Sequence, residues 1–289
     1  MKSPLWDLVR EALRDREVKA IDRIEQELSQ ATGSLPEPIF NALAAQIALL
    51  RGDERGARRC LIGASKKRPL DPHEKLILGF VLIQDPSKAE KLFRAAADAQ
   101  ISDPRVSEGL GLVAIREGRM DDGILHLSKS VQEDPRNWSA CYALAMALMH
   151  QGRYAQAGAR FEETVKLQPD FEPAWLGLAA AGIQTGRAAE VSEAMRRIVQ
   201  AAPQREKLTL AYVDCLRHAG DFESAAKALT PIADRTQDVD MLFDYVGLCL
   251  RGSLSESATK ALKKIEQIDP KQPRLQIYRN KLKELTECT

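Results

Sequence analysis

The chain has 289 residues, with 42 Lys and Arg against 41 Asp and Glu, and a formal net charge of +1. Apolar residues make up 44% of the chain and aromatic residues only 5%, which is typical of a helical protein rich in Ala and Leu. The normal apolar content excludes a disordered or collagen-like chain. The balanced charge argues against a basic nucleic-acid-binding protein, and no apolar run is long enough for a transmembrane helix.

The N-terminus and the cysteines indicate the compartment. Charged residues interrupt the first thirteen positions at Asp7, Arg10 and Glu11, so the apolar core of a secretion signal is missing. The cysteines are odd in number, scattered and without a CxxC or Cys/His cluster: Cys60, Cys141, Cys215, Cys249 and Cys288. We therefore expect a reducing cytoplasm, no disulfide framework, no metal and no other cofactor. Cys215 and Cys249 are expected to be small buried residues.

Glycines and prolines fall on a common lattice of 34 residues along the chain. Four glycines are spaced by 34, namely Gly118, Gly152, Gly186 and Gly220. Three prolines have the same spacing, namely Pro135, Pro169 and Pro203. Gly52 and Pro69 lie 66 residues before Gly118 and Pro135, so one intervening unit is two residues shorter. Two residue types on one lattice indicate an internal structural repeat.

Each unit has the pattern of two amphipathic helices, as residues 138–171 illustrate. In the first helix apolar residues recur every three or four positions, and Gly152 ends that helix. A second helix begins at Tyr154 and stops before Pro169. Ala145 and Ala157 are small enough to meet where the two helices cross, and equivalent pairs recur as Gly111 with Gly123, Ala45 with Ala57, and Gly79 with Ala89. A larger residue is expected beside each crossing: Leu61, Phe93, Leu127, Phe161, Met195, Leu229 and Leu262.

This pattern resembles the tetratricopeptide repeat. The residues that carry the resemblance begin at Trp175-Leu176-Gly177-Leu178-Ala179 and continue with Gly182, Val191, Met195, Ile198 and Pro203. The resemblance implies an all-α, right-handed α-solenoid spanning residues 1–289 as a single superhelix. Eight units are expected, at 3–37, 38–71, 72–103, 104–137, 138–171, 172–205, 206–238 and 239–272. Residues 1–37 are expected to form an irregular hairpin, 38–272 the remaining repeats, and 273–289 a capping helix.

In this family the first helices line a concave groove, which suggests candidate partner-binding residues. They are Phe80, Ile83, Leu112, Ile115, Arg116, Tyr142, Met146, Met149, Leu176 and Ile183. Simple packing between repeats is the alternative for each, and Arg105, Arg116 and His150 are expected at polar edges. Members that clamp a carboxylate have Lys and Asn where this chain has Leu76, Phe80, Tyr142 and Met146, which argues against a co-chaperone of that kind. Met146 and Met149 suit an adaptable binding surface.

Two basic segments lie mostly on second helices, one between Arg51 and Arg68 and the other between Lys260 and Arg274. A solvated surface is the simplest interpretation of both, and contact with an acidic protein partner is the alternative.

No motif indicates catalysis, since the four histidines lie in different repeats and HExxH, GxSxG and phosphate-loop patterns are missing. We therefore expect a non-enzymatic scaffold or adaptor that binds a peptide or helix of another protein in the groove. Bacterial motility, pilus and secretion assemblies are candidate settings. The alternatives are a chaperone or assembly factor that holds a client subunit, and a receptor for a signalling peptide. Nucleic-acid binding and membrane insertion are not expected, and the oligomeric state stays open.

Overall fold

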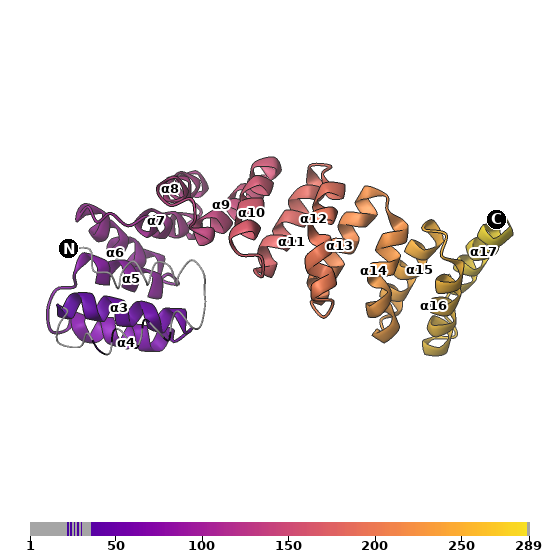
Figure 1. Cartoon of the computed structure of the whole chain (residues 1–289), viewed down its shortest axis with the longest axis horizontal. Coiled ribbons are helices and arrows are strands. Elements are labelled where there is room, and N and C mark those ends of the chain that lie inside the picture. Colours follow the sequence, from indigo (N-terminus) through magenta and orange to yellow (C-terminus); the bar gives the residue numbers. More distant parts are fainter. Residues whose placement is uncertain are drawn as a thin grey trace. The chain divides into compact units, whose positions relative to one another are not determined.

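The computed structural model describes residues 36–287 and, before them, residues 22, 24, 26, 28 and 30. Residues 37–287 form fifteen helices, and no strand occurs among the described residues (Figure 1). The predicted all-α class is therefore confirmed. The irregular hairpin predicted for residues 1–37 lies almost entirely outside the described residues.

The chain divides into two compact units, Met1–Asp170 and Phe171–Thr289. The first unit contains four described hairpins, one for each predicted repeat between residues 38 and 171. Their helices are α3 (Glu37–Leu50), α4 (Glu54–Ser65), α5 (Pro72–Val81), α6 (Pro86–Asp98), α7 (Arg105–Arg116), α8 (Met120–Glu133), α9 (Trp138–His150) and α10 (Tyr154–Leu167).

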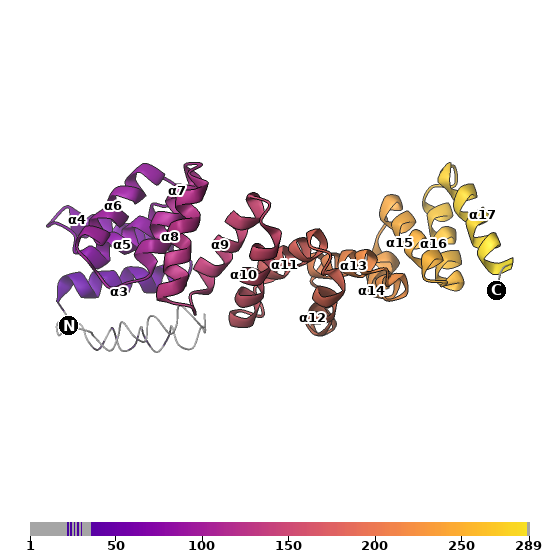
Figure 2. The same cartoon turned by 90° about the horizontal axis from the view of Figure 1, so that it is seen from above.

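The second unit contains three hairpins and a final single helix. Its helices are α11 (Glu172–Gln184), α12 (Ala188–Ala201), α13 (Glu206–Ala219), α14 (Phe222–Arg235), α15 (Val239–Arg251), α16 (Ser255–Ile268) and α17 (Arg274–Glu287). Figure 2 shows α17 beside α16, and α17 packs on both α16 and α15. Leu275 is buried there, and the Tyr278 ring lies with its centroid 5.1 Å from that of Phe243. These contacts cover part of the apolar face of the last hairpin.

Within each unit, every second helix packs on the following first helix, as α8 does on α9 and α14 on α15. First helices of neighbouring hairpins are also in contact. In the first unit α7 contacts α9, and in the second unit α11 contacts α13. We call the side of the first helices that faces away from the second helices the inner face. The opposite side, formed by second helices, is the outer face.

Local sequence signals explain where the helices begin and end. Asp53, Asn137 and Asp221 each accept a backbone N–H of the first turn through a side-chain oxygen, which satisfies a donor that has no partner within the helix. At the other end, five lattice glycines have φ between +72° and +82°: Gly52, Gly118, Gly152, Gly186 and Gly220. Residues with side chains rarely adopt this conformation, so these glycines mark the turn inside five of the seven described hairpins.

The closest approach in a hairpin occurs where its two helices cross. A Cβ atom added to Gly111 would lie 3.0 Å from the Gly123 carbonyl oxygen, so the two backbones are almost in contact. Ala145 and Ala157, which occupy the equivalent positions, are both fully buried. All seven larger residues predicted beside the crossings are buried as well. The predicted close approach of Gly111 and Gly123 is therefore confirmed, and the larger residues beside the crossings are buried as expected.

The last hairpin departs from the glycine lattice by one residue. Ser253 has a φ of +58°, whereas Gly252 has a φ of −90°. Gly252 lies so close to α14 that a Cβ atom would come within 2.8 Å of the Glu223 backbone. The glycine therefore permits close helix packing, and the serine takes the left-handed conformation at a cost in free energy.

We predict that Ser253→Gly increases the free energy of unfolding by about 0.5–1 kcal/mol, because glycine adopts the left-handed conformation without steric strain. Gly152→Ala, at a lattice position with a φ of +72°, should decrease it by about 1 kcal/mol. Urea unfolding followed by circular dichroism measures both changes. Destabilisation by Ser253→Gly would contradict the prediction.

Candidate binding surface

The predicted partner-binding residues lie on first helices or directly after one. In the first unit, Phe80 lies on α5, Leu112, Ile115 and Arg116 on α7, and Tyr142, Met146 and Met149 on α9. Ile83 follows α5 in the turn before α6. In the second unit, Leu176 and Ile183 lie on α11, where both are half-buried.

Phe80 and Ile83 contribute to the core of the first unit. The Phe80 ring meets the buried Phe93 ring edge to face, with 5.0 Å between centroids, and both Phe80 and Ile83 pack against the cluster of α5, α6 and α7. Phe93 reaches this position because Gly79 has no side chain, and a Cβ atom there would lie 2.6 Å from the ring. Phe80 and Ile83 therefore offer only part of their surface to a partner.

Ile115 and Tyr142 lean toward the second helix of their own hairpins. A Cβ atom on Gly123 of α8 would lie 2.5 Å from the Ile115 Cγ1 atom, so Ile115 covers that glycine. The Tyr142 ring lies 5.9 Å, centroid to centroid, from the buried Phe161 ring of α10. Both side chains are half-buried, and both help to hold their hairpin together.

Met146 is the most exposed apolar candidate, with 47% of its surface accessible. Most of α9 is buried, and its accessible residues recur at helical spacing along one strip: Ser139, Tyr142, Ala143, Met146, Met149 and His150. We call this set the α9 strip. Arg116 lies on the neighbouring first helix α7, is exposed, and donates from Nη1 to Gln84 Oε1 at 3.1 Å. The accessible side of α9 therefore combines a flexible thioether with the polar side chains of Ser139 and His150.

A buried polar network lies at the N-terminal ends of α7 and α9. Glu108 of α7 accepts from Asn137 Nδ2 at 2.8 Å and from Ser139 Oγ at 2.7 Å. Arg105 forms an ion pair with Asp103 at 2.7 Å and donates from Nη1 to Gln46 Oε1 of α3 at 2.8 Å. The Arg105 side chain is only 13% exposed, so its predicted role at a polar edge of the groove is wrong. These residues connect α3, α7 and the start of α9.

The environment of Glu108 determines how its charge responds to pH. Burial raises the pKa of the Glu108 carboxyl, and the hydrogen bonds from Asn137 and Ser139 and the Arg105 charge oppose that rise only in part. The folded state therefore holds the Glu108 proton more tightly than the unfolded chain does.

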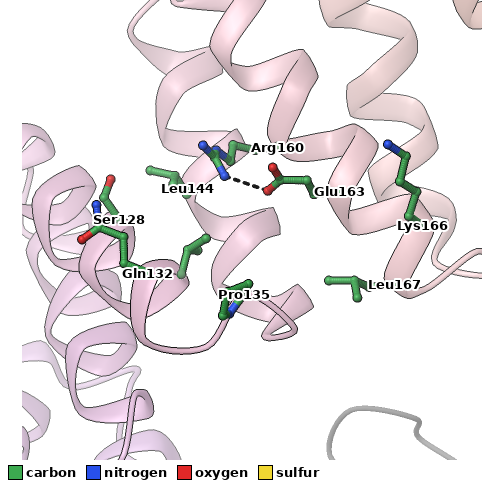
Figure 3. Close-up of a pocket in the computed structure, with 9 residues that line it drawn as sticks. Ser128, Gln132, Pro135, Leu144, Arg160, Glu163, Lys166 and Leu167 are labelled. Carbon is green, nitrogen blue, oxygen red and sulfur yellow. Dashed lines mark hydrogen bonds and ion pairs between the residues drawn. The ribbon is translucent and has the colours of Figure 1, made fainter.

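Two clefts open on the outer face, one in each unit. The first has a volume of about 570 Å³ and lies among α8, α9 and α10; we call it the α8–α10 cleft. Figure 3 shows Arg160 and Glu163 facing each other at its rim, joined by an ion pair of 2.7 Å. The second has a volume of about 550 Å³ and is lined by residues of α14, α15 and α16; we call it the α14–α16 cleft. The sequence analysis did not identify either cleft, because both depend on how far neighbouring second helices diverge.

The described cysteines are not poised as nucleophiles. Cys141, Cys215 and Cys249 are buried, as predicted for Cys215 and Cys249, and Cys60 is half-buried. Burial, with a further contribution from the Glu163 charge, raises the pKa of the Cys141 thiol to about 12, and burial raises that of Cys215 to about 11. A thiolate is the reactive form, so these thiols are unreactive near neutral pH.

The described part of the chain contains no group of three or more His, Cys, Asp or Glu side chains that could hold a metal ion. Within that part, no helix has the length and apolarity needed to cross a membrane.

Comparison with known proteins gives matches to the tetratricopeptide repeat. Models of this family match residues 83–137, 114–182 and 148–207. A search of curated proteins by sequence found no match.

Solved structures of low sequence identity share the fold. YrrB, described as a tetratricopeptide repeat protein with an unusual peptide-binding site, is 14% identical with a TM-score of 0.52, over 65% of this chain and 97% of its own. PilF of Pseudomonas aeruginosa is 18% identical with a TM-score of 0.50, over 72% of this chain and 96% of its own. In the complex of Naa15 and Naa10 bound to HypK, the match is 13% identical with a TM-score of 0.51 and covers 87% of this chain and 39% of the other.

We predict that Glu108→Gln removes a pH-dependent loss of stability. Because the folded state binds the Glu108 proton more tightly, wild-type stability should fall relative to the variant as the pH rises through the ordinary glutamate value of about 4.3 toward the raised folded-state pKa. Urea unfolding of both proteins between about pH 4 and pH 8 measures the difference, in which contributions from all other groups cancel. A difference that does not change with pH would contradict the prediction.

We also predict that Cys141, Cys215 and Cys249 react with a thiol reagent at pH 8 only after unfolding. A variant with Cys60→Ser and Cys288→Ser leaves these three as the only thiols of the chain. In the native protein their labelling should be slower by at least about a hundredfold than in urea, because burial restricts access and suppresses the thiolate. Fast labelling of the native protein would show that the hairpins open readily.

Proposed function

We propose that the chain, which matches models of the tetratricopeptide repeat within residues 83–207, is a non-enzymatic scaffold that binds a peptide or helix of a protein partner on the inner face. Proteins built from this repeat are generally interaction modules without catalytic activity. The observation that carries the proposal is the exposure of Met146 at the centre of the α9 strip.

The surroundings of Met146 favour a partner with apolar anchor residues. Neighbouring side chains on the strip, Tyr142 and Met149, are half-buried and add apolar surface at helical spacing. An amphipathic helix or an extended peptide presents apolar side chains at a comparable spacing, and methionine adjusts to their shape. His150 at the end of α9 and Arg116 at the end of the neighbouring first helix α7 are exposed and offer polar contacts.

The polar network beside the strip sets the limits of the proposed surface. Glu108 and Arg105 are occupied by partners inside the chain, so they do not contribute free charges to recognition. The proposed contact therefore relies on apolar burial at Met146 and Met149, with specificity from residues at the C-terminal half of α9. The roles proposed for Leu112 on α7 and for Leu176 and Ile183 on α11 follow from their repeat positions.

We predict that Met146→Glu weakens partner binding by at least about tenfold, because burial of a methionine side chain is worth about 1.5–3 kcal/mol and a buried carboxylate opposes it further. Proteins captured from the native organism by the wild-type chain and identified by mass spectrometry provide the partner for a binding measurement. The melting temperature of the variant should stay close to that of the wild type, since Met146 is exposed.

Leu125→Glu is the matched control, because Leu125 is a 68% exposed apolar residue on the outer helix α8. It introduces the same charge on the opposite side of the hairpin stack and should leave binding unchanged. Equal binding by Met146→Glu and the wild type would remove the α9 strip as the contact surface. Equal weakening by both variants would indicate a general charge effect.

A further inference from the structure

The α14–α16 cleft has a cationic lining that nothing in the proposed inner-face contact uses. Lys260, Lys263 and Lys264 of α16 line it together with a single carboxylate, that of Asp234 at the end of α14 (Figure 1 shows these helices). Three ammonium groups against one carboxylate give the cleft an excess of positive charge, even though the whole chain has a net charge of only +1.

Hydrogen bonds within the cleft occupy only part of the donor capacity of the lysines. Lys264 Nζ donates to the Ala233 and Asp234 carbonyl oxygens at 2.9 and 2.7 Å, which leaves one of its three protons. Lys260 Nζ donates to Asp234 Oδ1 at 2.8 Å, which leaves two. Lys263 is exposed at the same rim. The cleft therefore has spare charged donors.

Two of the three hydroxyl groups that line the cleft, those of Thr230 and Tyr245, are already engaged with each other. Thr230 donates its proton to the Ala226 carbonyl oxygen at 2.9 Å, so Tyr245 is the donor in the 3.0 Å contact between the two hydroxyls. A ligand in the cleft would therefore find charged donors at the rim and no hydroxyl proton of Thr230 or Tyr245 to accept. An anion with several acceptor oxygens fits this arrangement.

The α8–α10 cleft has a smaller excess of positive charge than the α14–α16 cleft. Aligning α10 with α16 by their first residues, Tyr154 and Ser255, places Glu163 where the second cleft has Lys264. Glu163 is paired with Arg160 at 2.7 Å, so the two charges at that rim compensate each other. Two clefts of similar volume thus differ in charge. Arg160 and Lys166 against Glu163 leave the first with an excess of one positive charge, and three lysines against Asp234 leave the second with an excess of two.

We propose that the α14–α16 cleft is a second binding site, which takes an acidic segment of a protein partner. The Lys260–Asp234 pair shows that this rim already holds a carboxylate, in this case one of the chain itself. Aspartate and glutamate side chains of a partner would bind Lys263 and the remaining protons of Lys260. A cleft of about 550 Å³ with three lysines is short for a nucleic acid, whose binding depends on many phosphate contacts along an extended basic surface.

The test is a titration of a fluorescein-labelled peptide with the full chain, in which the fluorescence anisotropy of the peptide is measured. The peptide has about twelve residues, with Glu and Ser alternating. The measurement is made at low salt, where exposed charges are least screened. Lys260→Gln with Lys263→Gln should raise the Kd by at least about tenfold. Lys66→Gln with Lys67→Gln removes the same charge from exposed lysines of the first unit and should change the Kd by less than about twofold. Met146→Glu should also bind the peptide normally, which separates this site from the inner-face contact.

Three results would overturn the proposal: no saturable binding of the acidic peptide, equal weakening by the two lysine pairs, or tighter binding of a single-stranded oligonucleotide of matching charge to the same cleft. Because Lys260 and Lys263 are exposed, the variant with Lys260→Gln and Lys263→Gln should have the same melting temperature as the wild type. A loss of peptide affinity then reports on the cleft. A peptide with Gln in place of Glu should not bind, since it lacks the carboxylates.

Discussion

The contact between small residues at the crossing of two helices is the constraint on which the described hairpins depend. Gly111 and Gly123 bring two backbones almost into contact, and the fully buried Ala145 and Ala157 meet the same requirement in the next hairpin. Close approach leaves a defined space beside the crossing, which the buried side chains of Leu127 and Phe161 fill. Interiors are packed to high density, so an enlargement at the crossing would displace the filling residue as well. One local requirement thus sets the geometry of each repeat.

This geometry makes the two faces of the hairpin stack unequal. On the inner face first helices touch one another, and most of their surface is buried between neighbours, as α9 illustrates. The few accessible positions on such a helix are therefore separated by helical spacing and lie along one strip, where Met146 is the most exposed apolar residue. On the outer face the second helices diverge, and clefts form above the intervening first helix. A partner would meet a narrow apolar strip on one side and polar-rimmed hollows on the other.

Periodic features of the fold could be predicted from the sequence, and features that depend on pairs of repeats could not. The positions of Gly152 and Pro169 predict where α9 and α10 end, and Asp85-Pro86 replaces the glycine turn between α5 and α6, because these signals act within a few residues. The repeat position of Arg105 places it at the start of the first helix α7, as the structure has it. Its burial depends on Asp103 and on Gln46, which lies 59 residues away, and no local pattern encodes that contact. The same limit applies to the candidate residues Phe80 and Tyr142, whose ring contacts lie on other helices.

The difference between the two outer clefts shows how a repeated backbone can acquire distinct binding chemistry. The hairpins supply similar hollows because the crossing geometry repeats, and few interactions of the fold depend on which polar side chains line them. Substitution at a rim position such as that of Glu163 and Lys264 therefore changes charge at little cost to packing. The near-neutral charge of the chain is consequently an average over locally different surfaces. Many charges on the described surface are compensated within ion pairs, as Lys227 and Glu223 are at 2.6 Å. Binding sites are therefore best sought where the local surface departs from the average, at the apolar α9 strip and at the lysine-lined α14–α16 cleft.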